Sequence, residues 1–239
     1  LPPSARYTQT LPRLPSFEMD QLNEELRDAP ILTTVIVVLV TVIVVLALRS
    51  GGGVDVYHLL TRTRRSVGSP DLYTGNPAPM ATIRKALECA IRAPNHFLSE
   101  PWRFRMLNAA QQEQIVELCA FDGKKPLFRK VPQMMVVSIE PSLGDDKWNV
   151  KALEDHAACA CAVQNFMVYL ASEGVATKWM TGAMGISGTV ILSDVCGIDT
   201  SASEHFMGVI MIGEPAQALD SLKVPTRKTG LSAPVLVEY

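Results

Sequence analysis

One segment of the chain, residues 31–48 (ILTTVIVVLVTVIVVLAL), is apolar apart from three threonines and carries no charged side chain. Its 18 residues would span roughly 27 Å as a helix, which is enough to cross the hydrocarbon core of a bilayer. The alternative is the core of a signal peptide, but 30 mostly polar residues precede the segment and no clear cleavage site follows it. We therefore predict one transmembrane helix over residues 31–48.

The rest of the chain has the composition of an ordinary globular protein. All 22 Lys+Arg and 24 Asp+Glu residues lie outside the apolar segment. This excludes wholesale disorder, a multi-span transporter and a small protein framed by disulfides. A net charge of −2 also argues against a nucleic-acid-binding protein, because such proteins usually carry a basic excess.

Basic residues on the two sides of the apolar segment differ in their setting. Within about 20 residues before it lie Arg13 and Arg27, among five acidic residues. The arginines that follow it outnumber the acids there: Arg49, Arg62, Arg64 and Arg65. The positive-inside rule then places the C-terminal bulk on the side of the cytosol, matrix or stroma. The chain begins with Leu1, which fits removal of an organellar targeting sequence, although a cloning boundary would look the same. We expect a single-pass organellar membrane protein, with the mitochondrial inner membrane favoured over the thylakoid.

The chain divides into four zones by composition. Residues 1–30 hold five prolines and form an expected extended tail, and residues 31–48 form the predicted transmembrane helix. Residues 49–56 include three consecutive glycines and are typical of a flexible linker. Residues 57–239 are long enough to form one domain with its own core.

Within that domain, the spacing of apolar residues predicts alternating helices and strands. The expected helices are 80–91, 109–120, 151–172 and 189–195, and the expected strands are 102–106, 133–139, 176–180 and 206–212. This alternation alone would suggest a doubly wound sheet. However, no G-x-G-x-x-G sequence follows a strand, so the dinucleotide-binding fingerprint of that fold is missing.

Several familiar kinds of catalytic site are not indicated. The five cysteines lie in apolar helical surroundings, and we expect them to pack in the core. The four histidines are scattered without a metal-binding spacing, so we expect no catalytic metal. There is also no nucleophile elbow of the G-x-S-x-G type and no P-loop.

Three short patterns remain as candidates for a binding site. Arg62-Thr63-Arg64-Arg65-Ser66 offers guanidinium groups and hydroxyls that suit a phosphate, although the same cluster could serve only membrane topology. Arg92-Ala93-Pro94-Asn95-His96 is followed by a strand containing P-W-R-F, and its histidine could equally be an ordinary surface residue. Residues 179–185 (WMTGAMG) form a strand that runs into small residues, where backbone amides could approach a flat ligand or simply turn.

Taken together, R-R-S, R-A-P-N-H, P-W-R-F and W-x-x-G-A resemble the nitroreductase family of FMN-dependent oxidoreductases, above all its small bacterial NAD(P)H nitroreductases. The resemblance covers about residues 59–225. It implies an α+β fold, a three-layer sandwich around a mostly antiparallel sheet, to which this chain adds the N-terminal transmembrane helix. It also implies an intertwined homodimer with FMN at the subunit interface.

The resemblance assigns roles to particular residues. Arg64, Arg65 and Ser66 would bind FMN from one subunit, and Arg92 and His96 would reach the same FMN from the partner subunit. The flavin ring would be lined by Met180, Thr181 and Gly182. The family's usual R-R-S-x-R has a further Arg where this chain has Gly68. Arg227 or Lys228 could compensate for that missing charge.

The function that follows is a membrane-anchored, FMN-dependent NAD(P)H oxidoreductase that reduces a nitro, quinone or enone-like acceptor by ping-pong hydride transfer. The flavin supplies the chemistry, so we name no catalytic side chain. One alternative is an accessory, non-catalytic subunit of a respiratory or photosynthetic membrane complex. Another is a membrane-anchored dehalogenase like iodotyrosine deiodinase, but residues 121–150 contain no tyrosine for that enzyme's substrate lid.

Overall fold

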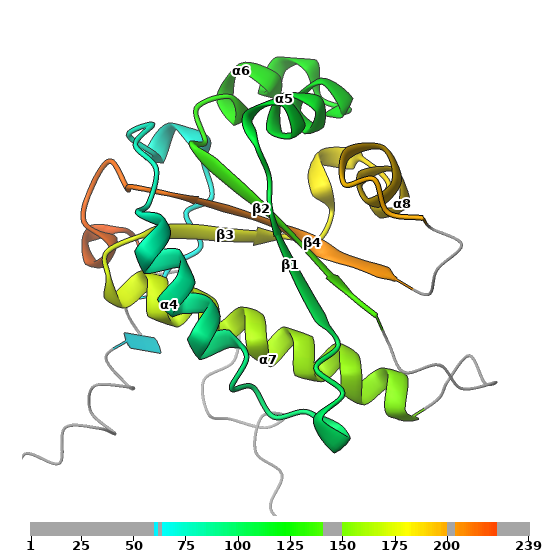
Figure 1. Cartoon of the computed structure of the whole chain (residues 1–239). Coiled ribbons are helices and arrows are strands. Elements are labelled where there is room, and N and C mark those ends of the chain that lie inside the picture. Colours follow the sequence, from blue (N-terminus) through cyan, green and yellow to red (C-terminus); the bar gives the residue numbers. More distant parts are fainter. Residues whose placement is uncertain (1–59, 62–63, 141–149, 200–203, 224–239) are drawn as a thin grey trace, which may run out of the picture. The chain divides into compact units, whose positions relative to one another are not determined.

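Four strands form one antiparallel sheet at the centre of the described chain (Figure 1). They are β1 (Trp102–Met106), β2 (Gln133–Ile139), β3 (Ala176–Met180) and β4 (His205–Gly213), in the spatial order β1-β2-β4-β3. The computed structural model describes residues 60–61, 64–140, 150–199 and 204–223. All of these lie in one unit, Tyr57–Tyr239.

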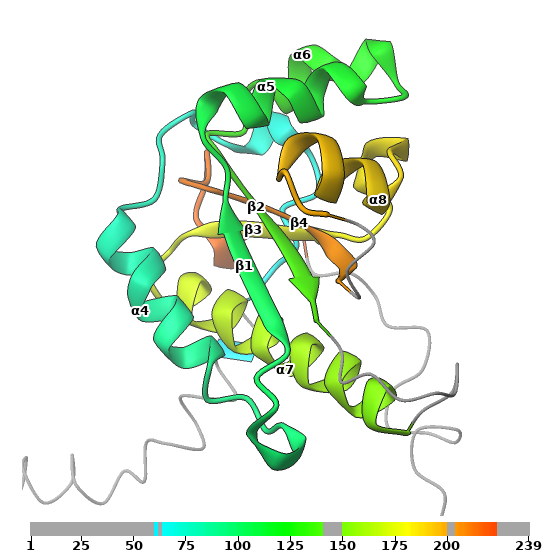
Figure 2. The same cartoon turned by 45° about the vertical axis from the view of Figure 1, so that its right-hand side comes forward.

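Helices lie on both faces of this sheet (Figure 2). The α-helices are α4 (Met80–Ala90), α5 (Ala109–Leu118), α6 (Lys125–Phe128), α7 (Val150–Ser172) and α8 (Gly188–Val190), and α8 continues into a π-helical turn, η5 (Ile191–Val195). Short 3-10 turns are η1 (Pro70–Leu72), η2 (His96–Leu98), η3 (Asp122–Lys124), η4 (Ala183–Gly185) and η6 (Leu219–Ser221).

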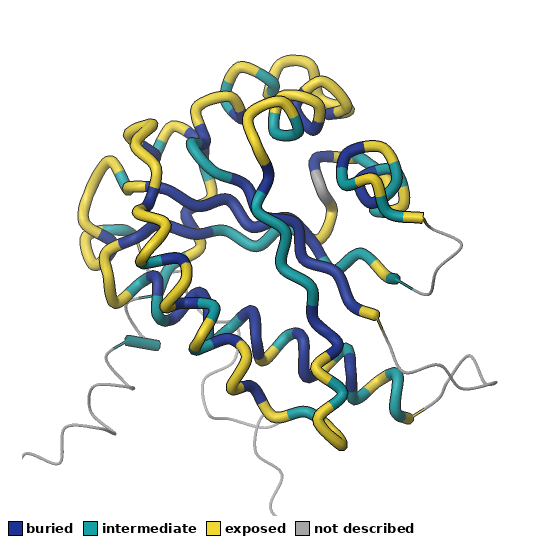
Figure 3. The backbone as a smooth tube through the Cα atoms, in the orientation of Figure 1, coloured by how far each residue is buried: buried dark blue, intermediate teal, exposed yellow. Residues whose placement is uncertain are grey.

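The central strand β2 is apolar along almost its whole length because both faces of the sheet are covered. Successive side chains of a strand point to opposite faces. Met134 and Val136 therefore pack in one core, whereas Met135 and Val137 pack in the other. Figure 3 shows the central strands as the most continuously buried part of the backbone. A sheet buried on both faces is typical of a three-layer arrangement.

One face of the sheet carries α4 and α7, which pack against each other. α4 buries Ile83, Ala86 and Ala90, which recur at helical spacing. Phe166 of α7 has no exposed surface, and its ring centroid lies 5.7 Å from that of Phe104 in β1. Full burial of such a side chain stabilises a fold by roughly 1.5–3 kcal/mol. This layer therefore contributes much of the core.

The other face is covered by α5 and by the helical segment of α8 and η5. α5 begins with a reciprocal capping box: the Asn108 side chain accepts a hydrogen bond from the Gln111 backbone, and Gln111 Oε1 accepts one from the Asn108 backbone. Gln111 Nε2 also donates to the carbonyl of Val195 at 2.9 Å. The cap thus starts α5 and ties it to η5.

A β-bulge interrupts the pairing of β2 with β4, between Val137 and Ser138. Opposite it, Gly208 adopts a φ of 142°. A Cβ atom at this position would lie 2.4 Å from Nε1 of Trp179, which donates a hydrogen bond to the Met207 carbonyl at 3.0 Å. The bulge therefore requires glycine and lets the Trp179 indole cross the neighbouring strand.

The structure confirms the expected α+β fold and its antiparallel sheet, and it contains all eight predicted helices and strands with small shifts at their ends. The predicted helix 109–120 ends at Leu118, and the predicted helix 189–195 begins at Gly188 and changes to π-helical geometry. The alternation of helices and strands did not produce a doubly wound sheet, because every pair of strands is antiparallel.

The expectation that all five cysteines pack in the core is wrong for one of them. Cys119 and Cys159 are buried and Cys89 and Cys196 are partly buried, but Cys161 is exposed. Cys161 is two positions from Cys159 on α7, which turns its side chain away from the face that packs on the sheet. The apolar context of a helix did not reveal which face each cysteine occupies.

No helix in residues 60–61, 64–140, 150–199 and 204–223 is both long enough and apolar enough to cross a membrane. The predicted tail at 1–30, the transmembrane helix at 31–48 and the linker at 49–56 lie outside the described residues.

Candidate functional site

The segment Arg64-Arg65-Ser66 lies along the outer edge of β3. Ser66 forms a parallel bridge with Thr177, and the backbone N–H of Val67 donates to the Thr177 carbonyl at 3.0 Å. Val67 is 1% exposed and anchors the segment in the core, whereas Ser66 is exposed and the two arginines are partly buried. We call residues 64–68 the cradle segment, because it presents basic groups and a hydroxyl beside the strand.

A tight turn follows the other end of the same strand. Met180 ends β3, and the exposed residues Thr181 and Gly182 come next. Met184 then adopts a left-handed conformation with a φ of 58°, and its carbonyl accepts a hydrogen bond from Ala120 at 3.1 Å. A Cβ atom at Gly182 would meet nothing within 4 Å, so the backbone here faces open space. Residues 180–182 can therefore contact a flat ligand.

Both of these predicted binding elements thus adjoin β3. The cradle segment pairs along its edge, and residues 180–182 lie at its end. Guanidinium groups with a neighbouring hydroxyl match the charge and the acceptor oxygens of a phosphate. The open turn leaves room for a planar ring close to the backbone. Residues 64–66 and 180–182 therefore fit a phosphate ester of a planar ring system.

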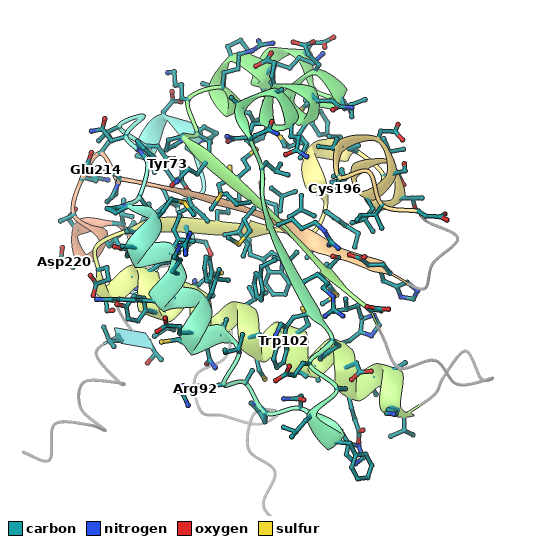
Figure 4. The ribbon with its side chains drawn as sticks, in the orientation of Figure 1. Tyr73, Arg92, Trp102, Cys196, Glu214 and Asp220 are labelled. Atoms are coloured by element: carbon teal, nitrogen blue, oxygen red, sulfur yellow. The ribbon has the colours of Figure 1, made fainter. Side chains whose placement is uncertain are left out.

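Arg92 and His96, the other two predicted binding residues, lie elsewhere. Arg92 follows the end of α4, and Figure 4 shows its side chain pointing away from the sheet. The His96 ring forms a hydrogen bond with Glu154 near the start of α7 and stacks on Phe97 at 4.2 Å between centroids. β3 instead follows the far end of α7, roughly 27 Å along the helix from Glu154.

The two groups of predicted site residues also lie against opposite faces of the sheet. The Met180 side chain packs in the core beside α5 and η5, whereas α4 and α7 belong to the other core. One chain therefore does not bring Arg92 and His96 to the β3 elements. The structure places the eight predicted site residues in two separate groups.

Two features near β3 lie outside the short motifs. The Nζ atom of Lys178 donates to the carbonyl of Gly68 at 3.0 Å. The ring of Phe121 would lie 3.3 Å from a Cβ at Gly185, in the turn after the strand. The sequence does mark Lys178, because a lysine within a mostly buried strand is unusual. The position of Phe121 depends on a tertiary contact, which the sequence does not reveal.

A buried hydroxyl lies close to this region. Tyr73 is 5% exposed, forms a bridge with Pro215, and its hydroxyl has no hydrogen-bond partner among the described residues. Burial raises the pKa of Tyr73, so the phenol stays neutral. It shares the core of Val67, the anchor of the cradle segment. Tyr73 is therefore a packing residue beneath the site.

Comparison with known proteins gives consistent results. The family model named Nitroreductase family matches residues 61–123 and 120–214. The chain is 26% identical over 174 residues to YfhC of Bacillus subtilis (strain 168), provisionally named an NAD(P)H nitroreductase, and the match covers 66% of this chain and 84% of YfhC.

Solved structures show the same fold. A nitroreductase-type structure from Desulfovibrio desulfuricans in complex with FMN has a TM-score of 0.58 at 20% identity, covering 76% of this chain and 95% of that one. Iodotyrosine deiodinase bound to FMN and 3-iodo-L-tyrosine has a TM-score of 0.57 at 16% identity, covering 75% of this chain and 99% of that one. With the family model spanning well over half of its length, this chain belongs to the nitroreductase family.

Proposed function

We propose that this protein is an FMN-dependent oxidoreductase that takes electrons from NAD(P)H and reduces a nitro, quinone or enone-like acceptor. The observation that carries the proposal is the arrangement on β3. The basic cradle segment pairs with this strand at Ser66, and the open turn of residues 180–182 ends it. Membership of the nitroreductase family and the FMN in the Desulfovibrio desulfuricans and deiodinase structures support the same cofactor.

Bound FMN would supply the redox chemistry by accepting a hydride from NAD(P)H and passing the electrons to the acceptor in a ping-pong sequence. The chain's residues would bind and orient. Arg64, Arg65 and Ser66 would hold the phosphate end through charge-assisted hydrogen bonds. The backbone of residues 180–182 would lie against the ring, where Gly182 leaves the approach open. No side chain need act as a nucleophile.

The remaining residues, Arg92 and His96, would come from a second copy of the chain. Around them lie apolar side chains that are largely exposed: Ile91 at 54%, Phe97 at 83%, Leu98 at 80%, Val150 at 69% and Leu153 at 71%. The hydrogen bonds His96 to Glu154 and Ser99 to Asp155 tie the loop to the start of α7, which gathers these residues on one surface. Exposed apolar surface of this kind marks an interface.

Backbone strain supports the same assignment. Phe97 and Leu98 have φ values of 51° and 54°, and Glu100 has 42°. Left-handed geometry costs about 1–3 kcal/mol at a non-glycine residue, and it persists where the surrounding structure enforces it, often at functional sites. Burial of Phe97 and Leu98 against a second copy would offset that cost. The same contact would carry Arg92 and His96 toward the partner's β3.

A mixed dimer tests the cofactor site and the dimer together. One subunit carries Arg64→Ala and Arg65→Ala, and the other carries Arg92→Ala and His96→Ala. If the site is shared between subunits, one site of the mixed dimer keeps every residue and the other loses all four. We expect about half of the wild-type FMN content, measured by absorbance after gel filtration, and NAD(P)H oxidation should fall in parallel.

The two parent proteins are the controls. Each homodimer of variants should lose most of its FMN, because loss of two charge-assisted contacts at roughly 1.5–3 kcal/mol each weakens binding by a hundredfold or more. A mixed dimer without FMN would mean that the site lies within one chain. A wild-type protein that binds no flavin would favour the accessory, non-catalytic subunit of a membrane complex.

We also propose that residues 31–48 anchor the protein in an organellar membrane, with the mitochondrial inner membrane favoured over the thylakoid. The uncharged length of the segment supports a single span. The arginines that follow it support a matrix or stroma location for the FMN domain.

A further inference from the structure

The cradle segment lacks one basic residue that its resemblance to the nitroreductase motif implies. Where R-R-S-x-R ends in arginine, this chain has Gly68. A side chain at position 68 would meet no atom within 4 Å of its Cβ, so the position has room for a longer residue. Steric crowding therefore does not explain the glycine. The phosphate end of the site would have one cation fewer than the motif supplies.

Lys178 brings a cation to this position from the neighbouring strand. The Ser66–Thr177 bridge runs in the parallel sense, which places residue 68 next to residue 179, one position beyond Lys178. The Lys178 side chain crosses to the cradle segment, and its Nζ donates to the Gly68 carbonyl at 3.0 Å. The two residues are 110 positions apart in the sequence. Strand alternation directs the side chains of positions 68 and 178 to opposite faces of the sheet, so Lys178 reaches the cradle segment through the backbone carbonyl of Gly68.

The Lys178 ammonium also has donors to spare. A lysine ammonium carries three N–H donors, and one of them goes to the Gly68 carbonyl. Other lysines of the domain are neutralised by acids: Lys125 pairs with Asp122 and Glu117, and Lys130 pairs with Asp71. The ion pairs of the described residues include none with Lys178. Its charge is therefore not offset by a carboxylate there.

We infer that Lys178 supplies the missing cation and binds the phosphate of FMN together with Arg64 and Arg65. This inference rests on the proposed function, and it names the part of FMN that Lys178 recognises. The Gly68 carbonyl holds the ammonium beside the cradle segment, and the remaining two N–H donors suit an anionic oxygen. A compact ammonium here acts as a point charge, whereas an arginine would offer two parallel hydrogen bonds.

The test compares FMN with riboflavin, which has the same ring and ribityl chain but no phosphate. Apoprotein of the full chain is titrated with each flavin, and flavin fluorescence gives the Kd. Lys178→Met removes the charge and keeps an apolar stem. We expect the Kd for FMN to rise about tenfold or more, as for loss of a hydrogen bond to a charged group. The Kd for riboflavin should stay within about twofold.

A rescue variant sharpens the test. Lys178→Met combined with Gly68→Arg returns a cation through the open space at position 68, and it should bring the FMN affinity back toward wild type. Lys85→Ala removes an exposed lysine from α4 and serves as the matched control; its Kd values should equal those of wild type. Thermal denaturation of each apoprotein shows whether a variant is folded before titration.

The outcomes separate this inference from the proposed function. An unchanged Kd for FMN in Lys178→Met would overturn the inference and leave the proposed FMN site standing. An equal loss of FMN and riboflavin affinity would also overturn it, because Lys178 would then only shape the cradle segment through Gly68. Wild-type protein that binds neither flavin would remove the proposed function and this inference together.

Discussion

Glu214 connects the turn after the cradle segment to the end of β4 (Figure 4). Its carboxylate accepts hydrogen bonds from Thr74 Oγ1 at 2.8 Å and from Asn76 Nδ2 at 2.6 Å. These bonds stabilise the charged form, so they hold the pKa of Glu214 below its ordinary value, the Asn76 bond having the larger effect. The carboxylate is exposed to solvent, so we expect the contribution to be small and pH-dependent.

The sign of that dependence follows from the lowered pKa. A carboxyl group that is more acidic in the folded state stabilises the fold above the pKa of the unfolded chain, and it loses this contribution as the pH falls through the folded pKa. We predict that Asn76→Ala lowers the melting temperature by about 1–3 °C at pH 7 and by less at pH 3. Thermal unfolding followed by circular dichroism at both pH values measures the difference.

The control is Glu214→Gln, which keeps an acceptor oxygen but cannot titrate. The pH-dependent part of the Asn76→Ala effect should be absent when that substitution is made in the Glu214→Gln background. If the drop in melting temperature caused by Asn76→Ala were larger at pH 3 than at pH 7, the charged Glu214 carboxylate would not be its cause.

At the scale of the secondary-structure elements, the bulge between β2 and β4 controls the strand that carries the site. Gly208 lies where a Cβ would be 2.4 Å from Trp179 Nε1 and 2.8 Å from the Met180 carbonyl. Trp179 and Met180 are the last residues of β3 before the turn at Thr181. A side chain at position 208 must therefore move the backbone that the flavin ring is proposed to contact.

We predict that Gly208→Ala lowers the free energy of unfolding by about 1–3 kcal/mol, the usual cost of forcing extra atoms into a packed site. The φ of 142° adds strain for any residue with a Cβ. Urea denaturation followed by tryptophan fluorescence gives the stability, and a shifted native emission maximum would report movement of Trp179.

Gly123→Ala is a suitable comparison, since a Cβ there would meet nothing within 4 Å and its φ is not positive. Equal stabilities of the Gly123→Ala and Gly208→Ala proteins would contradict the importance of the bulge.

For the whole molecule, the prediction concerns the side of the membrane on which the domain lies. The charge pattern around residues 31–48 predicts that the domain and the four following arginines share one side. Protease added to that side of sealed vesicles, the matrix or stroma side, should digest the domain and leave a protected N-terminal fragment. Antibodies against the two ends of the chain distinguish the fragments. Selective loss of residues 1–30 from the same side would reverse the orientation.

Detergent-solubilised vesicles are the control, because both ends should then be digested. Retention of the protein in the membrane pellet after alkaline carbonate extraction distinguishes an integral span from a peripheral attachment. Release into the supernatant would remove the proposed anchor and leave the proposed FMN site unaffected, since the two rest on different residues.

The sequence alone determined the local elements, because their signals act between near neighbours. Apolar residues three and four positions apart predicted α4 and α7, and the continuous apolar run at 133–139 predicted β2. Gly174 marks the end of α7, where it adopts a φ of 73°. The short motifs likewise identified the family, because each motif lies within a few residues of chain.

Only the tertiary structure decided which distant segments meet. The periodicity of a strand predicts which of its residues share a face, but not which segment pairs with it. The antiparallel order β1-β2-β4-β3 and the pairing of Ser66 with Thr177 could therefore not be predicted from the local sequence. The same holds for the exposure of Cys161, which depends on the face of α7 that packs on the sheet. The left-handed conformations of Phe97, Leu98 and Glu100 could not be predicted from residue propensity. The contact of Lys178 with Gly68 joins residues 110 positions apart, and it exists because burial of both faces of the sheet fixes β3 beside the cradle segment.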